Sequence, residues 1–226
     1  MPERFIKMNE KDFFQINRDG LEFLKVCWDK CLIPYSTNQK SEDIYKTLCV
    51  YYSEKHRAYH NLSHIKSLFV LCEDFKSHIE DFSSVGFAIW FHDVVYNTKR
   101  SDNEEKSAEL AEITLSDFNL PKEKIEKVCA MILGTKKHDA RKLSDDTKLF
   151  LDFDLSILGA DAATYYAYSQ AIRKEYSWVF DFVYKRERKK ILESFLERDF
   201  IYNTNEMRKR FEAQARANIE NEMREL

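Results

Sequence analysis

The sequence contains very little glycine and proline, with 4 and 3 residues of each type in 226. Tight turns and β-hairpins depend on these residues, so their scarcity argues against a many-stranded β architecture and favours a helical one. No apolar run approaches the ~18 residues that span a bilayer. The N-terminus alternates charged and apolar residues and lacks the continuous apolar core of a signal peptide. These absences predict an all-α, cytoplasmic protein that has no membrane contact.

An excess of charge of one sign is also lacking. The 36 basic and 39 acidic residues are interspersed and give a net charge of −3, so no surface for a nucleic-acid polymer is expected and a small molecule is the expected ligand.

The five cysteines are odd in number and lie in apolar helical patterns, which favours buried reduced thiols over disulfides. The length fits a single domain over 1–226, with the C-terminal helices of 186–226 packed on its core. A homodimer is left open beside a monomer.

Apolar periodicity and capping residues predict the helices of this bundle. Pro121 suits a first helical position, and Gly159 suits a helix end. The predicted segments are 11–32, 41–52, 61–78, 85–96, 102–118, 121–134, 147–158, 161–184, 186–202 and 204–226. The basic run at 185–190 is interpreted as a solvated helix face, because apolar residues resume directly after it.

Two histidine-bearing motifs are the most informative features. Residues 59–64 (Tyr-His-Asn-Leu-Ser-His) place His60 and His64 four positions apart, on one face if the segment is helical. Residues 90–96 (Trp-Phe-His-Asp-Val-Val-Tyr) hold Asp93 in an apolar, aromatic run, where a carboxylate is costly to bury unless its charge is compensated. A divalent cation would compensate it, and histidines are common partners of such a cation. The motifs therefore predict a metal centre.

The predicted ligands are His64, His92, Asp93 and Asp154. Adjacent helical side chains point about 100° apart, so His92 and Asp93 converge on one ion only near a helix end or with the metal along their bisector. Asp152 is the alternative to Asp154, since both acids lie in the apolar run 150–159. Taken alone, the histidine pair, the His-Asp pair and the acid at 152 or 154 each also fit an ordinary helix cap or surface pair. The metal is left open among Mg, Mn, Zn, Ni, Co and Fe, with one or two ions.

In its order of motifs the chain resembles the HD superfamily of metal-dependent phosphohydrolases. More narrowly, it resembles a bacterial family of predicted HD-superfamily phosphohydrolases of about this length. Those proteins carry Tyr-His-Asn-x-x-His, Phe-His-Asp-x-Val-Tyr and Asp-x-Asp-Leu-x-Ile-Leu-Gly segments, found here at 59–64, 91–96 and 152–159. The segments 171–176 and 215–218 also resemble segments of that family. The resemblance implies an HD-domain-like helical bundle and hydrolysis of a phosphate ester.

The segment 59–64 is also similar to one in cyclic-nucleotide phosphodiesterase catalytic domains. In those domains the second histidine binds metal and the first protonates the leaving oxygen. The similarity implies that His64 is a ligand and His60 the general acid. The rest of the chain departs from the phosphodiesterase pattern, and Asp154 follows the His-Asp pair much sooner, so cyclic nucleotides are not implied.

The predicted function is metal-dependent hydrolysis of a small phosphate ester or nucleotide, with phosphomonoesterase, phosphodiesterase and nucleotidase activities left open. The metal would lower the pKa of a bound water from 15.7 towards neutrality for attack on phosphorus, with His60 and Asp93 as catalytic residues. The candidate substrate-binding residues are Arg57, Asn61, Tyr96, Glu104, Arg173 and Lys174. The alternatives are a di-iron oxygenase, for which His138 would supply a further ligand, and a non-catalytic metal- or nucleotide-binding module.

Overall fold

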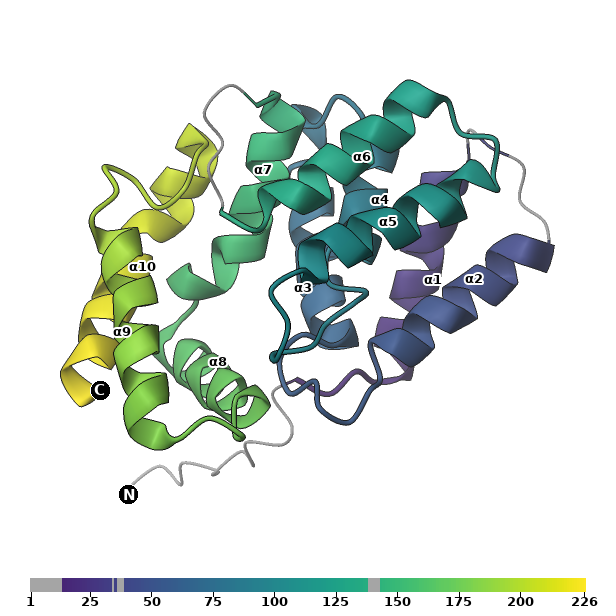
Figure 1. Ribbon diagram of the computed structural model, residues 1–226. Helices are drawn as coiled ribbons and strands as arrows, with labels where there is room; N and C mark the ends of the chain where they lie inside the picture. Colours follow the sequence, from purple (N-terminus) through teal and green to yellow (C-terminus); the bar gives the residue numbers. More distant parts are fainter. Residues whose placement is uncertain (1–13, 34, 36–38, 138–142) are drawn as a thin grey trace, which may run out of the picture.

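The computed structural model describes residues 14–33, 35, 39–137 and 143–226. These residues form ten α-helices and two 3₁₀ helices and contain no strand, which confirms the all-α prediction (Figure 1). The α-helices are α1 (Arg18–Leu32), α2 (Gln39–Tyr51), α3 (Leu62–Asp74), α4 (Phe82–Phe91), α5 (Asn103–Ser116), α6 (Lys122–Gly134), α7 (Asp145–Asp154), α8 (Ala162–Glu175), α9 (Asp181–Leu196) and α10 (Asn205–Glu225). The 3₁₀ helices are η2 (Lys76–His78) and η3 (Leu155–Gly159). None of the described helices combines the length and apolar character needed to cross a membrane.

Helix α4 is the centre of the larger half of the molecule. Its sequence is apolar nearly all round, as expected of a helix buried on every side, and every residue from Ser83 to Phe91 is buried. It packs against α1, α3, α5, α6 and α7. The carboxylate of Asp81 caps its start by accepting the Ser84 N–H at 3.2 Å. The helix ends at Phe91, and the buried His92 follows it directly.

The C-terminal helices form the other side of the molecule, to the left in Figure 1. Helix α10 packs on η3 and on α9, and α8 also packs on η3. The buried side chain of Asn218 on α10 donates to the carbonyls of Leu158 and Ala160, each at 2.8 Å. Both carbonyls flank the end of η3, so α10 is docked directly behind the segment that follows α7.

Gly159 allows this close approach. A Cβ atom at this position would lie 2.6 Å from the Cβ of Phe211 and 2.7 Å from its carbonyl oxygen. The carbonyl is helix backbone and cannot rotate away, so we expect Gly159→Ala to lower the free energy of unfolding by about 1–3 kcal/mol. Gly134→Ala is the matched control, because its Cβ would meet only Leu151 side-chain atoms at 3.5 Å or more. Urea unfolding of both variants measures the difference, and equal stabilities would contradict it.

Several predicted helices differ from the structure in their bounds, and the segments 61–78, 147–158 and 186–202 correspond to α3, α7 and α9 with shifted ends. The first begins at Arg18, capped by Asn17, and the predicted start at Lys11 lies outside the described residues. The predicted helix 85–96 stops at Phe91. The predicted helix 161–184 is broken into α8 and α9. The break is stabilised by Arg173, whose guanidinium donates to the carbonyls of Tyr176 at 2.8 Å and Val179 at 3.1 Å.

Candidate metal centre

The predicted metal ligands are brought together by the ends of three helices. His64 lies in the first turn of α3, His92 and Asp93 directly follow α4, and Asp154 is the last residue of α7. The start of α3 is fixed by Asn61, whose side-chain oxygen accepts the Ser63 N–H at 2.8 Å. Because His92 and Asp93 lie at a helix end, their side chains can converge although they are adjacent in sequence.

The donor atoms of His64, His92 and Asp154 lie at spacings that suit a single ion, and Asp93 adjoins this group through His92. His64 Nε2 is 3.2 Å from His92 Nε2 and 3.3 Å from Asp154 Oδ1. His92 Nε2 is 3.5 Å from Asp154 Oδ1 and 3.2 Å from Asp93 Oδ2. Divalent metals bind nitrogen and oxygen at about 2.0–2.2 Å, which places neighbouring ligand atoms about 3–3.5 Å apart. Within the described residues, His64, His92 and Asp154 are the one group of three or more potential ligands this close together.

The hydrogen-bonding and charge of this cluster also suit a cation. His92 Nδ1 lies 2.9 Å from the carbonyl of Ile89, to which it donates a proton, so Nε2 can present its lone pair to the cluster. Burial opposes protonation of His92, but Asp93 and Asp154 outweigh it and raise its pKa well above the usual value. Burial lowers the pKa of His64. The two carboxylates therefore favour positive charge at the place where the two Nε2 atoms meet.

Asp152 lies outside the cluster. Its carboxylate accepts the Asn203 N–H at 2.6 Å and the Asn203 Nδ2 at 2.9 Å. It also accepts the Thr204 N–H at 2.8 Å and the Thr204 hydroxyl at 2.7 Å. These four bonds join the end of α7 to the chain just before α10. Of the two candidate acids, the structure places Asp154 with the histidines and gives Asp152 an anchoring role.

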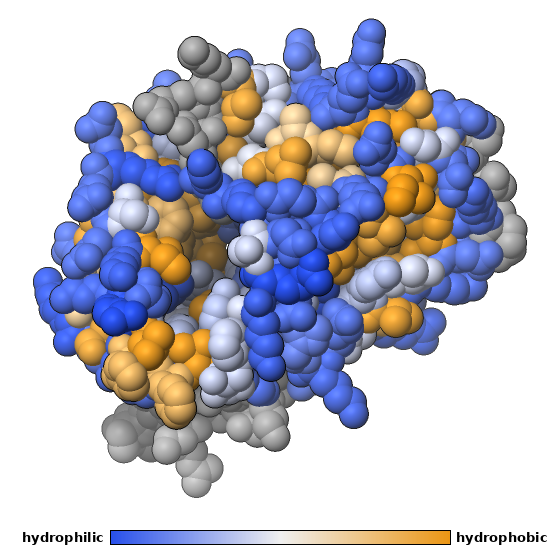
Figure 2. All heavy atoms as spheres, in the orientation of Figure 1, coloured by the Kyte–Doolittle hydropathy of each residue, from blue (hydrophilic) through white to orange (hydrophobic). Residues whose placement is uncertain are grey.

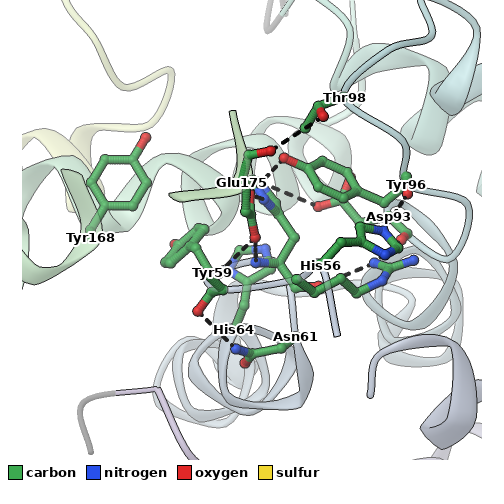
Figure 3. A network of polar contacts seen from close by, with 12 residues as sticks. His56, Tyr59, Asn61, His64, Asp93, Tyr96, Thr98, Tyr168 and Glu175 are labelled. Atoms are coloured by element: carbon green, nitrogen blue, oxygen red, sulfur yellow. Dashed lines mark hydrogen bonds and ion pairs between the residues drawn. The ribbon is translucent and has the colours of Figure 1, made fainter. Parts of the chain in front are cut away.

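His60 is held beside the cluster by a buried carboxylate that the sequence analysis did not single out. Its Nδ1 lies 2.7 Å from Glu175 Oε2, and its Nε2 lies 3.9 Å from Asp93 Oδ2. Glu175 also accepts the His60 N–H at 3.0 Å. It accepts the Tyr59 N–H and the Tyr96 hydroxyl as well, each at 2.7 Å (Figure 3). All four hydrogen bonds to the Glu175 carboxylate therefore come from Tyr59 and His60, just before α3, and from Tyr96.

His60 and Glu175 each stabilise the charged form of the other. Burial penalises both charged forms, yet Glu175 raises the pKa of His60 above its usual value. In turn, His60 and the hydrogen-bond donors lower the pKa of Glu175 to about 2. Glu175 and Asp93 therefore favour the protonated form of His60, in which Nδ1–H is donated to Glu175 and Nε2 lies on the side of Asp93.

Arg57 lies away from the cavity next to the metal cluster, where the sequence analysis expected it to bind substrate. Its side chain is fully buried, and it adjoins the second hollow instead of this cavity. Its guanidinium donates to the carbonyls of His60 at 3.1 Å, Asp93 at 2.7 Å and Val94 at 2.9 Å. It therefore joins the backbones of the two histidine motifs.

We expect Arg57→Met to lower the free energy of unfolding by about 3 kcal/mol, because each buried carbonyl that loses a charged donor costs about 1–3 kcal/mol. Arg100→Met is the control, since Arg100 is exposed and bonds only to Asp102 among the described residues. An exposed pair of this kind contributes little to stability. Denaturant unfolding in a chelator separates this effect from metal binding, and a loss no larger than that of Arg100→Met would contradict the assignment.

The other predicted substrate residues divide into two groups. Tyr96 and Glu104 line the cavity next to the cluster. Asn61 caps α3, and Arg173 binds backbone carbonyls at the break between α8 and α9. Asn61 and Lys174 face a second, separate hollow. Of these residues, Tyr96 and Glu104 are the two that line the cavity next to the cluster, and His138 lies outside the described residues.

The cavity has a volume of about 790 Å³ and extends from the cluster to α8, α9 and η3. Figure 2 shows this face hollowed between the α9 side and the rest of the molecule, with apolar residues in the hollow. Tyr168, Tyr184 and Arg188 line this part, and the sequence analysis did not single out Tyr184 or Arg188. Arg188 belongs to the basic run interpreted as a solvated face, but its side chain is only 7% exposed.

Comparisons of the chain with models of protein families, with curated proteins and with solved structures found no match. Membership of the HD superfamily therefore stays a prediction from the motifs.

Proposed function

We propose that this protein is a metal-dependent phosphohydrolase that acts on a small phosphate ester or nucleotide. The observation that supports this most is the convergence of donor atoms from His64, His92 and Asp154, with Asp93 beside His92, next to a cavity that Asp93 and Asp154 line. A divalent metal bound by these atoms would lower the pKa of water for attack on phosphorus and withdraw charge from the phosphoryl oxygens. Their spacing and chemistry fit such an ion.

His60 would supply the proton for the leaving oxygen. Glu175 holds its Nδ1–H and keeps it charged, so Nε2–H is the group presented towards Asp93 and the cavity. Proton donation of this kind typically contributes ~10²–10⁴-fold in rate. Asp93, between His92 and His60, would orient the attacking water as well as bind the metal. Glu175 and Tyr96 act through His60 and are positioning residues.

Metal analysis combined with an activity screen tests this proposal. The purified protein is stripped with a chelator and reloaded separately with Mg²⁺, Mn²⁺, Zn²⁺, Ni²⁺, Co²⁺ or Fe²⁺. We expect the stripped protein to release no phosphate from a panel of phosphate esters and nucleotides, and at least one metal to restore release. Two irons with oxygen-dependent turnover would instead support the oxygenase. Tightly bound metal without hydrolysis of any ester would support a binding module, and hydrolysis that survives complete stripping would exclude the proposed mechanism.

A further inference from the structure

The cavity is much larger than a phosphoryl group requires. Its volume of about 790 Å³ falls in the upper part of the roughly 300–1,000 Å³ range of pockets that enclose drug-sized ligands. Of the residues that the proposed function uses, His60, Asp93, Tyr96 and Asp154 line this cavity, and most of its lining comes from other residues. If the proposed function is correct, the remaining space receives the organic part of the substrate.

The wall beyond the cluster is mainly apolar and aromatic. It is built from η3, α8, the α8–α9 connection and α9. Representative lining residues are Leu158, Ile172, Val183, Tyr168, Tyr176 and Tyr184. Apolar and aromatic walls of this kind bind flat, apolar groups by dispersion and stacking, and offer little to a hydroxyl-rich sugar.

Arg188 is the buried cation in this wall. Its Nε donates to Glu222 at 2.8 Å, its Nη2 to the same carboxylate at 3.0 Å, and its Nη1 to the Tyr168 hydroxyl at 3.4 Å. A guanidinium has five N–H groups, so two have no partner among the described residues. Glu222 already neutralises the charge of Arg188. The remaining N–H groups therefore suit a neutral acceptor, such as a carbonyl or ring nitrogen, better than a phosphate group additional to the one at the metal cluster.

A second unsatisfied donor lies on the same helix face. The hydroxyl of Tyr184 is buried and has no hydrogen-bond partner among the described residues. Tyr184 and Arg188 are four residues apart on α9, so their side chains are neighbours, and both line the cavity. Buried polar groups without a partner are rare in native proteins. A ligand atom that accepts hydrogen bonds here would satisfy both residues.

We propose that the substrate is the phosphate ester of a flat, uncharged aromatic group that carries a hydrogen-bond acceptor, and that Arg188 and Tyr184 donate to this acceptor. This proposal rests on the proposed hydrolase function. A nucleobase and an aromatic carbonyl compound share this chemistry.

Two bicyclic esters separate the contribution of the acceptor from that of size. 4-Methylumbelliferyl phosphate carries a ring carbonyl, whereas 2-naphthyl phosphate has a similar shape without one. We expect Tyr184→Phe and Arg188→Lys each to lower kcat/KM at least tenfold more for the first ester than for the second. Comparing each variant with the wild type cancels the intrinsic difference in leaving-group reactivity. Lys189→Met, exposed on α9 outside the cavity, is the control and should leave the ratio unchanged.

A binding measurement on the metal-free protein gives a readout independent of catalysis. We expect 4-methylumbelliferone to bind more tightly than 2-naphthol by calorimetry, and Tyr184→Phe to remove most of that preference. Tyr184→Phe deletes only an unpaired hydroxyl, so it keeps the test valid even if Arg188→Lys unfolds. Equal losses on both esters, or no preference in binding, would overturn the proposal.

Phenyl phosphate and nucleoside 5′-monophosphates complete the experiment. Metal-dependent hydrolysis of phenyl phosphate with no preference for either bicyclic ester or any nucleotide would overturn this inference and leave the hydrolase intact. If no ester is hydrolysed with any metal, the proposed function itself fails. A nucleotide preferred over 4-methylumbelliferyl phosphate would identify a nucleobase as the aromatic group, and the reverse order would identify an aromatic carbonyl compound.

Discussion

Replacement of His92 with alanine is expected to remove the metal and to lower phosphate-ester hydrolysis by about 10³-fold or more. His92 Nε2 lies within 3.5 Å of donor atoms from His64, Asp93 and Asp154, and it is the one ligand close to all three. A bound metal contributes several kcal/mol to the stabilisation of the transition state, and every 1.36 kcal/mol is a factor of ten in rate. Metal content by mass spectrometry and initial rates of phosphate release measure both effects.

His78→Ala is the matched control for this variant. His78 is exposed, lies on η2 and does not line the cavity, so metal content and rate should equal those of the wild type. Thermal unfolding of His92→Ala and wild-type protein in a chelator shows whether the buried side chain is needed for folding. A folded His92→Ala protein that keeps its metal and its rate would rule out the assigned metal centre.

His60→Ala is expected to lower kcat by ~10²–10⁴-fold while the metal is retained. His60 contributes no atom to the cluster of closest donors and instead presents Nε2 at 3.9 Å from Asp93. The loss should depend on the leaving group. Esters of acidic phenols need little protonation of the leaving oxygen and should be affected least, whereas alkyl phosphates should be affected most. Rates for a series of esters, with metal analysis of the same samples, test this.

Glu175→Gln distinguishes a positioning role from a structural one. The carboxamide can keep most of the contacts of Glu175 but removes the charge that raises the pKa of His60. The alkaline limb of the kcat profile reports loss of the His60 proton, so it should move to lower pH in this variant. A uniform loss of rate at every pH, or loss of metal from His60→Ala, would contradict the assignment of His60 as the acid.

The fold class and the central cluster could be predicted because their signals are local. Scarce glycine and proline, together with apolar periodicity, indicate helices without knowledge of their packing. Likewise, a carboxylate in an apolar run at Asp93 or Asp154 indicates that something must compensate its charge. This argument could not decide between Asp152 and Asp154 as the metal ligand, because both acids lie in the same apolar run. They differ in a long-range contact, since Asp152 accepts hydrogen bonds from Asn203 and Thr204.

Glu175, Arg188 and Arg57 were missed or misassigned for the same physical reason. Glu175 contacts residues 115 and 116 positions away, and Arg188 pairs with Glu222, 34 positions away. In a charged helical segment, a buried acid or arginine has the same sequence pattern as a solvated one. Arg57 precedes His60 by three residues, and nothing in the sequence shows that backbone carbonyls, and not a phosphate, surround it.

The bonds between Asp152 and residues 203–204 have a consequence for proteolysis of the intact chain. Proteolytic loss of residues 203–226 would remove the donors to the Asp152 carboxylate and leave this buried acid without them. Asp154 is only two positions further along, so we expect the disturbance to reach the proposed metal ligand although no histidine is removed. We therefore expect the truncated protein to bind a divalent metal less tightly than the intact chain.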